Sequence, residues 1–258
     1  MTFYDWITSS YDNPSIKGQW GLGHILTLLL CAGIILGLTF IFRKRSVPTK
    51  RIAIFALVGL ILFFELLRRC LNIYKTTDYS FHNILHILLP RPWCAISCWM
   101  LIISTFVNKK FFYNIASITS LLCAIIFFAY PGVGFNNKYI LFENLYSIVT
   151  HALLLTTSIT LITLKFTKFE YKTIWKELIC FAVIFVYAFI EIYLLKIEGD
   201  PLYFMPNGDI QDILGVSYAV YLLLYIGFIS IYTNVFYLIG DRKNVIKKRK
   251  KLNKQLQK

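Results

Sequence analysis

A cysteine that follows a pair of prolines is the residue of this sequence best suited to chemistry. Cys94 comes directly after Leu89-Pro90-Arg91-Pro92-Trp93. Because a proline removes a backbone donor and interrupts a helix, we expect Cys94 to begin a fresh helical turn whose free amides face its thiol. His151, in a later apolar segment, would complete a nucleophile–base pair. The alternatives are a packing cysteine, a hydroxyl nucleophile beside His151, and a histidine that only bonds between helices.

Charged side chains inside apolar segments form a second group. Such a residue costs a few kcal/mol in a membrane and normally faces a bundle interior or a water-filled cavity. A helical rise of about 1.5 Å per residue brings these side chains to one level near the outer surface, which predicts an outward-facing polar pocket. Arginines there could bind phosphate; alternatively they snorkel to the interface, and Glu65 pairs with Arg69. The predicted substrate-binding residues are Arg91, Arg68, Arg69, Glu65, Glu191 and His86.

The composition is that of an integral membrane protein. Of the 258 residues, 57% are hydrophobic and 16% are charged, and the mean hydropathy is +0.62. A soluble domain is nearer half apolar and a quarter charged, so a soluble enzyme is excluded. The six cysteines form no CxxC pair and have no zinc spacing, so we expect neither a metal nor another cofactor.

Apolar runs separated by turns and charges predict an all-α fold, with seven transmembrane helices in one bundle. The third helix is predicted to be broken at Pro90 and Pro92. Residues 1–240 would form this transmembrane domain, and residues 241–258 a basic cytoplasmic tail. The predicted spans are 21–42, 52–73, 84–107, 111–129, 144–164, 177–197 and 213–239.

The charges of the connecting segments predict an orientation. Segments 43–51, 108–110, 165–176 and 241–258 carry twenty Lys and Arg residues, whereas the segments on the opposite side carry three. Because positive loops stay on the cytoplasmic side, we expect a multi-pass protein of the cell membrane with an extracytoplasmic N-terminus and a cytoplasmic C-terminus. The basic tail would rest on anionic lipids of the inner leaflet, and nucleic acid is not expected as a partner.

Several short motifs occur in the order and spacing of a known membrane family. Leu89-Pro90 and Cys94 fit the pattern L-P-x-x-x-C, Tyr130-Pro131 follows the fourth predicted span, and residues 144–151 read N-L-Y-S-I-V-T-H. Asp200-Pro201-Leu202-Tyr203-Phe204 stands where the family usually has N-Y-x-x-L. On these motifs the chain resembles the YwaF-like family of bacterial seven-span membrane proteins. That family is distantly similar to a eukaryotic transmembrane phospholipid acyltransferase and to androgen-induced membrane lipid hydrolases.

The resemblance implies roles for two residues. Cys94 would match the acyl-carrying cysteine of the acyltransferase relatives, and His151 the histidine shared with the hydrolases. The sequence also departs from the family pattern. The family often has a histidine two residues before the cysteine, where this chain has Pro92, and the Asn-Tyr pair of the last loop is replaced.

We therefore expect a lipid-modifying acyltransferase or acyl hydrolase that acts on membrane phospholipid in the outer leaflet. In this hypothesis His151 activates Cys94, and the arginines bind the phosphate. Two other classes stay open. Broken helices with charged neighbours also build sites for small anionic solutes in transporters and binding proteins. A noncatalytic membrane scaffold would use only the apolar helix faces and the basic tail.

Overall fold

The computed structural model describes residues 6–7, 20–129, 134–135, 140–197, 202, 206 and 209–242. The described residues lie in helices and connecting turns, and none of them is in a strand. The chain divides into two compact units, Met1–Thr167 and Lys168–Lys258. Three sequence features fall outside the described residues: the Tyr130-Pro131 motif, all but Leu202 of the 200–204 motif, and the tail beyond Arg242.

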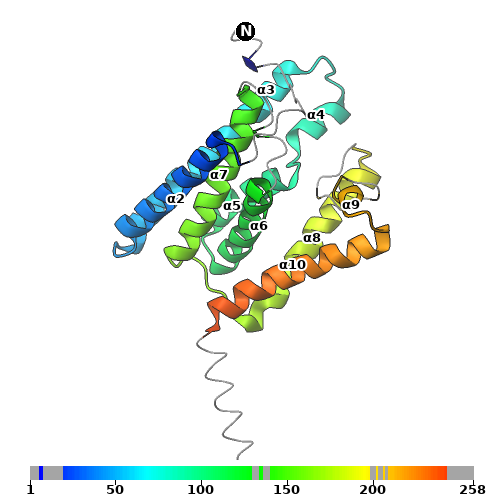
Figure 1. Ribbon diagram of the computed structural model, residues 1–258. Coiled ribbons are helices and arrows are strands. Elements are labelled where there is room, and N and C mark those ends of the chain that lie inside the picture. The colour runs from blue at the N-terminus through cyan, green and yellow to red at the C-terminus, as the bar shows by residue number, and fades with distance from the viewer. Residues whose placement is uncertain are drawn as a thin grey trace, which may run out of the picture. The chain divides into compact units, whose positions relative to one another are not determined.

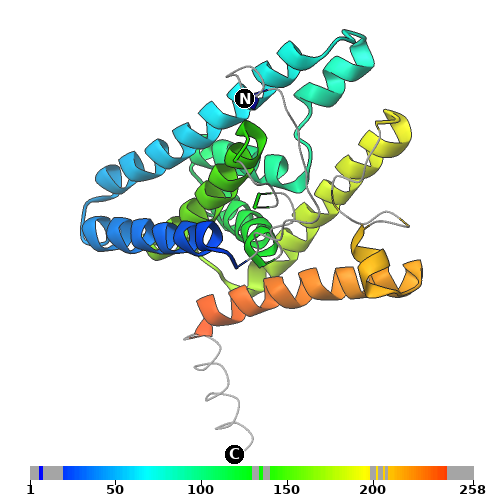
Figure 2. The ribbon, with the colours of Figure 1, turned by 45° about the horizontal axis from the view of Figure 1, so that its top comes forward.

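The first unit places its helices around α5, α6 and α7 (Figures 1 and 2). Each of these three packs on the other two, α3 packs on both α5 and α7, and α2 packs mainly on α7. Proline in the first turn begins α3, and Asn108 in the left-handed conformation (φ 53°) ends α5. The helices are α2 (Leu22–Phe42), α3 (Val47–Lys75), α4 (Phe81–Leu88), α5 (Trp93–Val107), α6 (Lys110–Ala129) and α7 (Phe142–Thr163).

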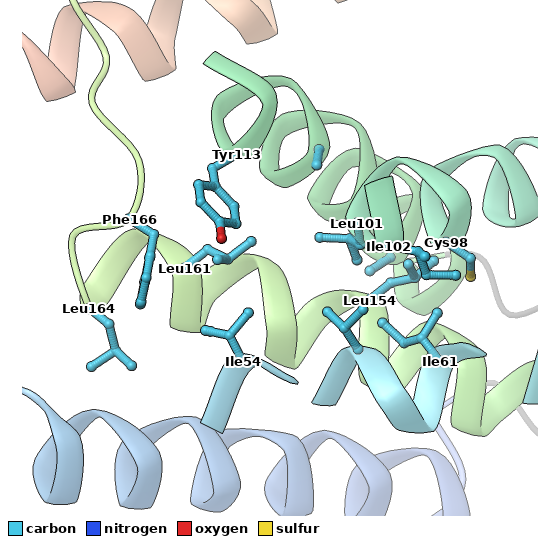
Figure 3. Close-up of a cluster of buried hydrophobic side chains, with 13 residues drawn as sticks. Ile54, Ile61, Cys98, Leu101, Ile102, Tyr113, Leu154, Leu161, Leu164 and Phe166 are labelled. Atoms are coloured by element: carbon cyan, nitrogen blue, oxygen red, sulfur yellow. The ribbon is translucent and has the colours of Figure 1, made fainter. Parts of the chain in front are cut away.

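An apolar core joins α3, α5, α6 and α7 of this unit. Figure 3 shows side chains of these helices and of the turn after α7 pointing into one cluster. Such packing fixes each helix about its own axis, because a rotation would open voids in a close-packed interior. The core therefore determines which polar side chains of these helices can meet. Its members include Ile54, Ile61, Cys98, Leu101, Tyr113, Leu154 and Leu161.

Several of the helices are suited to a membrane. Among the described residues, α2, α6, α7, Tyr171–Leu194 and α10 (Tyr218–Gly240) are long and apolar enough to cross one, and α4 with α5 adds a sixth span if the bent pair counts as one. The 29-residue α3 is not among them, and it carries Glu65, Arg68 and Arg69 in its second half. The protein is thus helical with five or six candidate spans, and the count of seven stays a prediction.

The chain changes direction between α4 and α5. The two helices are bent by 63° around the segment 89–92. The Pro92 carbonyl accepts hydrogen bonds from the amides of Ala95 (2.9 Å) and Ile96 (3.2 Å), which opens α5. Proline itself has no amide hydrogen with which to continue α4 across this segment. Cys94 consequently lies in the first turn of α5.

A tight turn before α4 is organised by Asp78. Its carboxylate accepts hydrogen bonds from the backbone N–H and the hydroxyl of Ser80, both at 2.9 Å. The Ser80 hydroxyl in turn caps α4, because its oxygen accepts a hydrogen bond from the backbone N–H of Asn83 at 3.3 Å. The hydrogen bonds from the Ser80 backbone and side chain lower the pKa of Asp78 below its ordinary value.

This turn should depend on pH. A carboxylate whose folded pKa is lowered stabilises the fold above the ordinary Asp pKa of about 3.9, and the contribution is lost as the pH falls through the lowered value. We expect the Ser80 amide to exchange hydrogen more slowly in the parent than in Asp78→Asn near neutral pH. The difference should vanish in acid. A difference that persists in strong acid would contradict the role given to the carboxylate.

The second unit also buries carboxylates. The Tyr237 hydroxyl donates to Glu177 at 2.6 Å, and both side chains are fully buried. The Tyr187 hydroxyl donates to the buried Glu191 at 2.5 Å. The elements of this unit are the 3₁₀ turn Tyr171–Thr173, α8 (Ile174–Phe189), the π-helical turn Ile190–Leu194, α9 (Asp209–Leu214) and α10 (Tyr218–Gly240).

Candidate functional site

Cys94 lies where the start of α5 borders the apolar core of the first unit. The half-buried Cys94 and Cys123 of α6 both pack against this core. Arg68 of α3 donates to the carbonyl oxygen of Arg91, three residues before Cys94. Since Cys94 is the second residue of α5, its turn also contains the amides that lack an acceptor within the helix. The start of α5 thus has a thiol in its first turn and an arginine of α3 bound to the segment that precedes it.

The His151 ring is held in a definite orientation on α7. Its Nδ1 lies 2.7 Å from the carbonyl oxygen of Ser147, one turn earlier on the same helix. Because a carbonyl oxygen only accepts, Nδ1 must carry the hydrogen, and a neutral ring then keeps its lone pair on Nε2. Phe127 of α6 stacks on the ring, with the centroids 3.8 Å apart and the planes at 7°. The contact with the Ser147 carbonyl therefore fixes the tautomer of the ring.

Glu65 lies fully buried at the centre of a charged cluster. Its Oε1 accepts a hydrogen bond from the Tyr146 hydroxyl of α7 at 2.6 Å. Its Oε2 lies 3.0 Å from Nη1 of Arg69 and 3.6 Å from Nη2 of Arg68. The pairing expected from the i,i+4 spacing of Glu65 and Arg69 is present. At 5% exposure, Arg69 does not reach the surface by snorkelling.

The two arginines link this carboxylate to the neighbouring helices. Arg68 donates from both terminal nitrogens to the carbonyl oxygen of Arg91, at 3.3 Å each, in the segment between α4 and α5. Its guanidinium lies over the Tyr146 ring, 5.6 Å from the centroid, and that of Arg69 lies over the Trp99 ring of α5 at the same distance. The cluster therefore ties the C-terminal part of α3 to α7 and to the start of α5.

The other predicted site residues have different surroundings. Arg91 is half-buried in the segment between α4 and α5, and His86 is exposed on α4. Glu191 belongs to the second unit, where it is buried beside Tyr187. The first unit thus contains Cys94, His151, Arg68 and Glu65, and of these it brings Arg68 and Glu65 into direct contact. Among the described residues, no group of three or more His, Cys, Asp or Glu side chains is arranged to hold a metal ion.

Sequence reasoning missed three side chains of this site. Tyr146 holds Glu65, and it stands in the N-L-Y-S-I-V-T-H motif, so a signal for it existed. Cys123 lies in a plain apolar run that gives no signal for its place beside the same core as Cys94. Phe127, which stacks on His151, is one of 22 phenylalanines and is equally unmarked. Only the packing of α6 between α5 and α7 brings the last two into the site.

Comparison with known proteins assigns the family of the chain. No curated protein and no solved structure matches it. The profile of the TMEM164 family, a family of multi-span membrane proteins, matches residues 19–239. The match includes the segment around Cys94, the whole of α7 and all but the last residue of α10. The chain therefore belongs to the TMEM164 family.

Proposed function

We propose that this protein is a membrane-embedded lipid-modifying enzyme, either a phospholipid acyltransferase or an acyl hydrolase. Its nucleophile is Cys94 and its base is His151. The observation that supports the proposal is the position of Cys94 in the first turn of α5 and of His151 on α7, two helices that pack on each other and on α6. The L-P-x-x-x-C pattern supports the same assignment, because in the resembling acyltransferases that cysteine carries the acyl group.

The first half-reaction forms a thioester. The Cys94 thiol gives its proton to Nε2 of His151, and the sulfur attacks the carbonyl carbon of a fatty acyl ester. The C–S bond forms and the ester C–O bond breaks. His151 then returns the proton to the departing lysolipid alkoxide. The amides of the first turn of α5 are suited to stabilising the oxyanion that forms on the way.

The second half-reaction releases the acyl chain. Water, or a hydroxyl or amine of a second head group, gives a proton to His151 and attacks the thioester carbon. The C–S bond breaks, and the sulfur takes back the proton. Water gives hydrolysis and a lipid acceptor gives transfer. One Cys–His pair therefore supports both activities, and access of the acceptor decides between them.

The charged cluster is suited to a phosphodiester head group. Arg68 and Arg69 carry two positive charges against the one negative charge of Glu65, which leaves a net charge that one phosphodiester anion balances. The Nε of Arg68 is buried and makes no hydrogen bond to the described residues. Arginine also matches the fork geometry of phosphate oxygens. We assign phosphate binding to Arg68, with Arg91 from the adjacent segment as its partner.

The proposal also covers the number of membrane spans and their orientation in the membrane. We take α3 as the seventh span, with its charges turned into the bundle, where Glu65 and Arg69 are buried. The excess of Lys and Arg in segments 43–51 and 108–110 favours a cytoplasmic position for that end of the first unit. The N-terminus is then extracytoplasmic, and the Cys94 site opens toward the outer leaflet of the cell membrane.

Covalent labelling tests the nucleophile. Membranes that contain the full chain are incubated with a phospholipid carrying an alkyne-tagged fatty acyl chain, and labelled protein is detected after coupling to a dye. We expect a label that hydroxylamine removes, as it does a thioester. Cys94→Ala should lose the label, whereas Cys98→Ala, a change one turn further along α5, should keep it. A label that survives Cys94→Ala would overturn the proposal.

A further inference from the structure

Two buried nitrogen donors lie close together between α3 and α5, and the mechanism above uses neither of them. The Arg69 guanidinium of α3 lies over the Trp99 ring of α5, with its Cζ 5.6 Å from the ring centroid. Nη2 of Arg69 and Nε1 of Trp99 are both buried, and neither makes a hydrogen bond to the described residues. Because a buried N–H without an acceptor is unfavourable, this arrangement favours an acceptor at the same place.

The Glu65 carboxylate beside Arg69 is already engaged by other groups. Its Oε1 accepts a hydrogen bond from the Tyr146 hydroxyl at 2.6 Å. Its Oε2 is shared, because it lies 3.0 Å from Nη1 of Arg69 and 3.6 Å from Nη2 of Arg68. One carboxylate therefore stands against two guanidinium groups. The acceptor for Nη2 of Arg69 and for the indole N–H has to come from another source.

The charge of the cluster indicates an anion rather than a neutral acceptor. Arg68, Arg69 and Arg91 carry three positive charges, and the carboxylate of Glu65 supplies one negative charge. Even with a lipid phosphodiester on Arg68 and Arg91, one positive charge remains. It lies at Arg69, which is only 5% exposed. Since a buried cation without a full counter-charge is unfavourable, one further negative charge would stabilise this part of the first unit.

We propose that Arg69 and Trp99 bind one monovalent halide ion, such as chloride, between α3 and α5. A hydrogen bond from nitrogen spans about 3 Å, so one ion can accept from a guanidinium and an indole that lie 5.6 Å apart. Burial of both donors selects a small ion of single charge, because the cost of removing an ion from water rises steeply with its charge. The bound ion neutralises Arg69 and links α3 to α5.

Equilibrium binding of radiolabelled chloride to the purified full chain in phospholipid nanodiscs tests the site, which does not depend on the proposed enzyme activity. Gluconate replaces chloride as the background anion, so that the ionic strength stays constant. We expect saturable binding of one ion per chain that bromide displaces. Inorganic phosphate and glycerophosphocholine at the same concentration should not displace it. Displacement by either phosphate compound would assign the donors to a head group and overturn the proposal, as would the absence of saturable binding.

Two variants test the donors. Trp99→Phe keeps a ring beneath Arg69 and removes the indole N–H, so chloride binding should weaken about 10–100-fold, as for the loss of a hydrogen bond to a charged group. The double variant Glu65→Gln/Arg69→Met removes the cation and should lose saturable binding. The matched control Trp175→Phe, at an exposed position of α8, should bind chloride as the parent does. Unchanged affinity in Trp99→Phe would overturn the proposal.

Thermal unfolding gives a second measurement that separates binding from folding defects. The parent should unfold at a higher temperature in chloride than in gluconate of the same ionic strength, because a ligand that binds only the folded state stabilises it. Trp99→Phe should show little difference between the two salts, whereas Trp175→Phe should show the difference of the parent. Equal unfolding temperatures of the parent in both salts would contradict the site.

Discussion

Replacing His151 by alanine should lower the rate of acyl transfer by about 10²–10⁴-fold, the usual contribution of a positioned general base. The Nδ1 hydrogen of the ring is bound to the Ser147 carbonyl at 2.7 Å, so Nε2 is left to take the proton of the proposed nucleophile, Cys94. His151→Asn is the sharper variant, because its amide can still donate a hydrogen bond but cannot accept a proton at physiological pH. The measurement is the initial rate of transfer from a tagged phospholipid by purified protein in nanodiscs.

The matched control is His82→Ala, which removes an exposed histidine of α4 in the same unit. Its rate should stay within about twofold of the parent, since surface substitutions away from a site change little. Both His151 variants should bind the lipid as the parent does, because the phosphate is assigned to arginines. A rate reduced by less than about tenfold in His151→Asn would remove this residue from the mechanism.

Replacing Glu65 by glutamine should lower the free energy of unfolding by about 3–5 kcal/mol, the cost of leaving a buried charge without its partner. Arg69 is 5% exposed, and its Nη1 lies 3.0 Å from the Glu65 carboxylate. A neutral amide in that place cannot balance the guanidinium, and the Tyr146 hydroxyl also loses a charged acceptor. The measurement is equilibrium unfolding of the purified protein in detergent micelles.

Three further variants separate charge from hydrogen bonding. Glu143→Gln, an exposed position at the start of α7, should be within about 0.5 kcal/mol of the parent. Tyr146→Phe removes one hydrogen bond to a charged group and should cost about 1.5–3 kcal/mol. The double variant Glu65→Gln/Arg69→Met removes both buried charges and should recover much of the lost stability. A Glu65→Gln protein as stable as Glu143→Gln would contradict the central role of this carboxylate.

The helical class could be predicted from the sequence because it depends on local properties. A run of about twenty apolar residues needs a fully hydrogen-bonded backbone in lipid, and a helix provides that within the segment itself. The predicted ranges 111–129 and 144–164 differ from α6 and α7 by no more than two residues at either end. The range 52–73 misses the first turn of α3, where Val47 and Pro48 begin the helix among basic residues. The basic residues of that turn lower its hydropathy, so a prediction based on hydropathy leaves the turn out.

The candidate site was only partly visible in the sequence. Spacing on one helix is enough to predict the pairing of Glu65 with Arg69, since residues four apart share a helix face. The two prolines before Cys94 were also enough to single out this residue, because prolines interrupt one helix and are typical of the start of the next. No residue spacing in the sequence predicts which side chains of other helices these residues contact. Phe127 stacks on His151 only because α6 turns the face that bears it toward α7.

The sequence by itself determined that this protein belongs in a membrane, which segments are helical and which residue types are available for chemistry. The membrane environment follows from the transfer free energies of the side chains, and the helices follow from short-range backbone geometry. Only the tertiary structure decided which of those residues meet. Helix rotation is set by the close packing of side chains such as Leu101 and Leu154, and a small change of rotation moves a side chain to another face. For that reason the stacking of Phe127 on the His151 ring is a property of the folded core rather than of any motif.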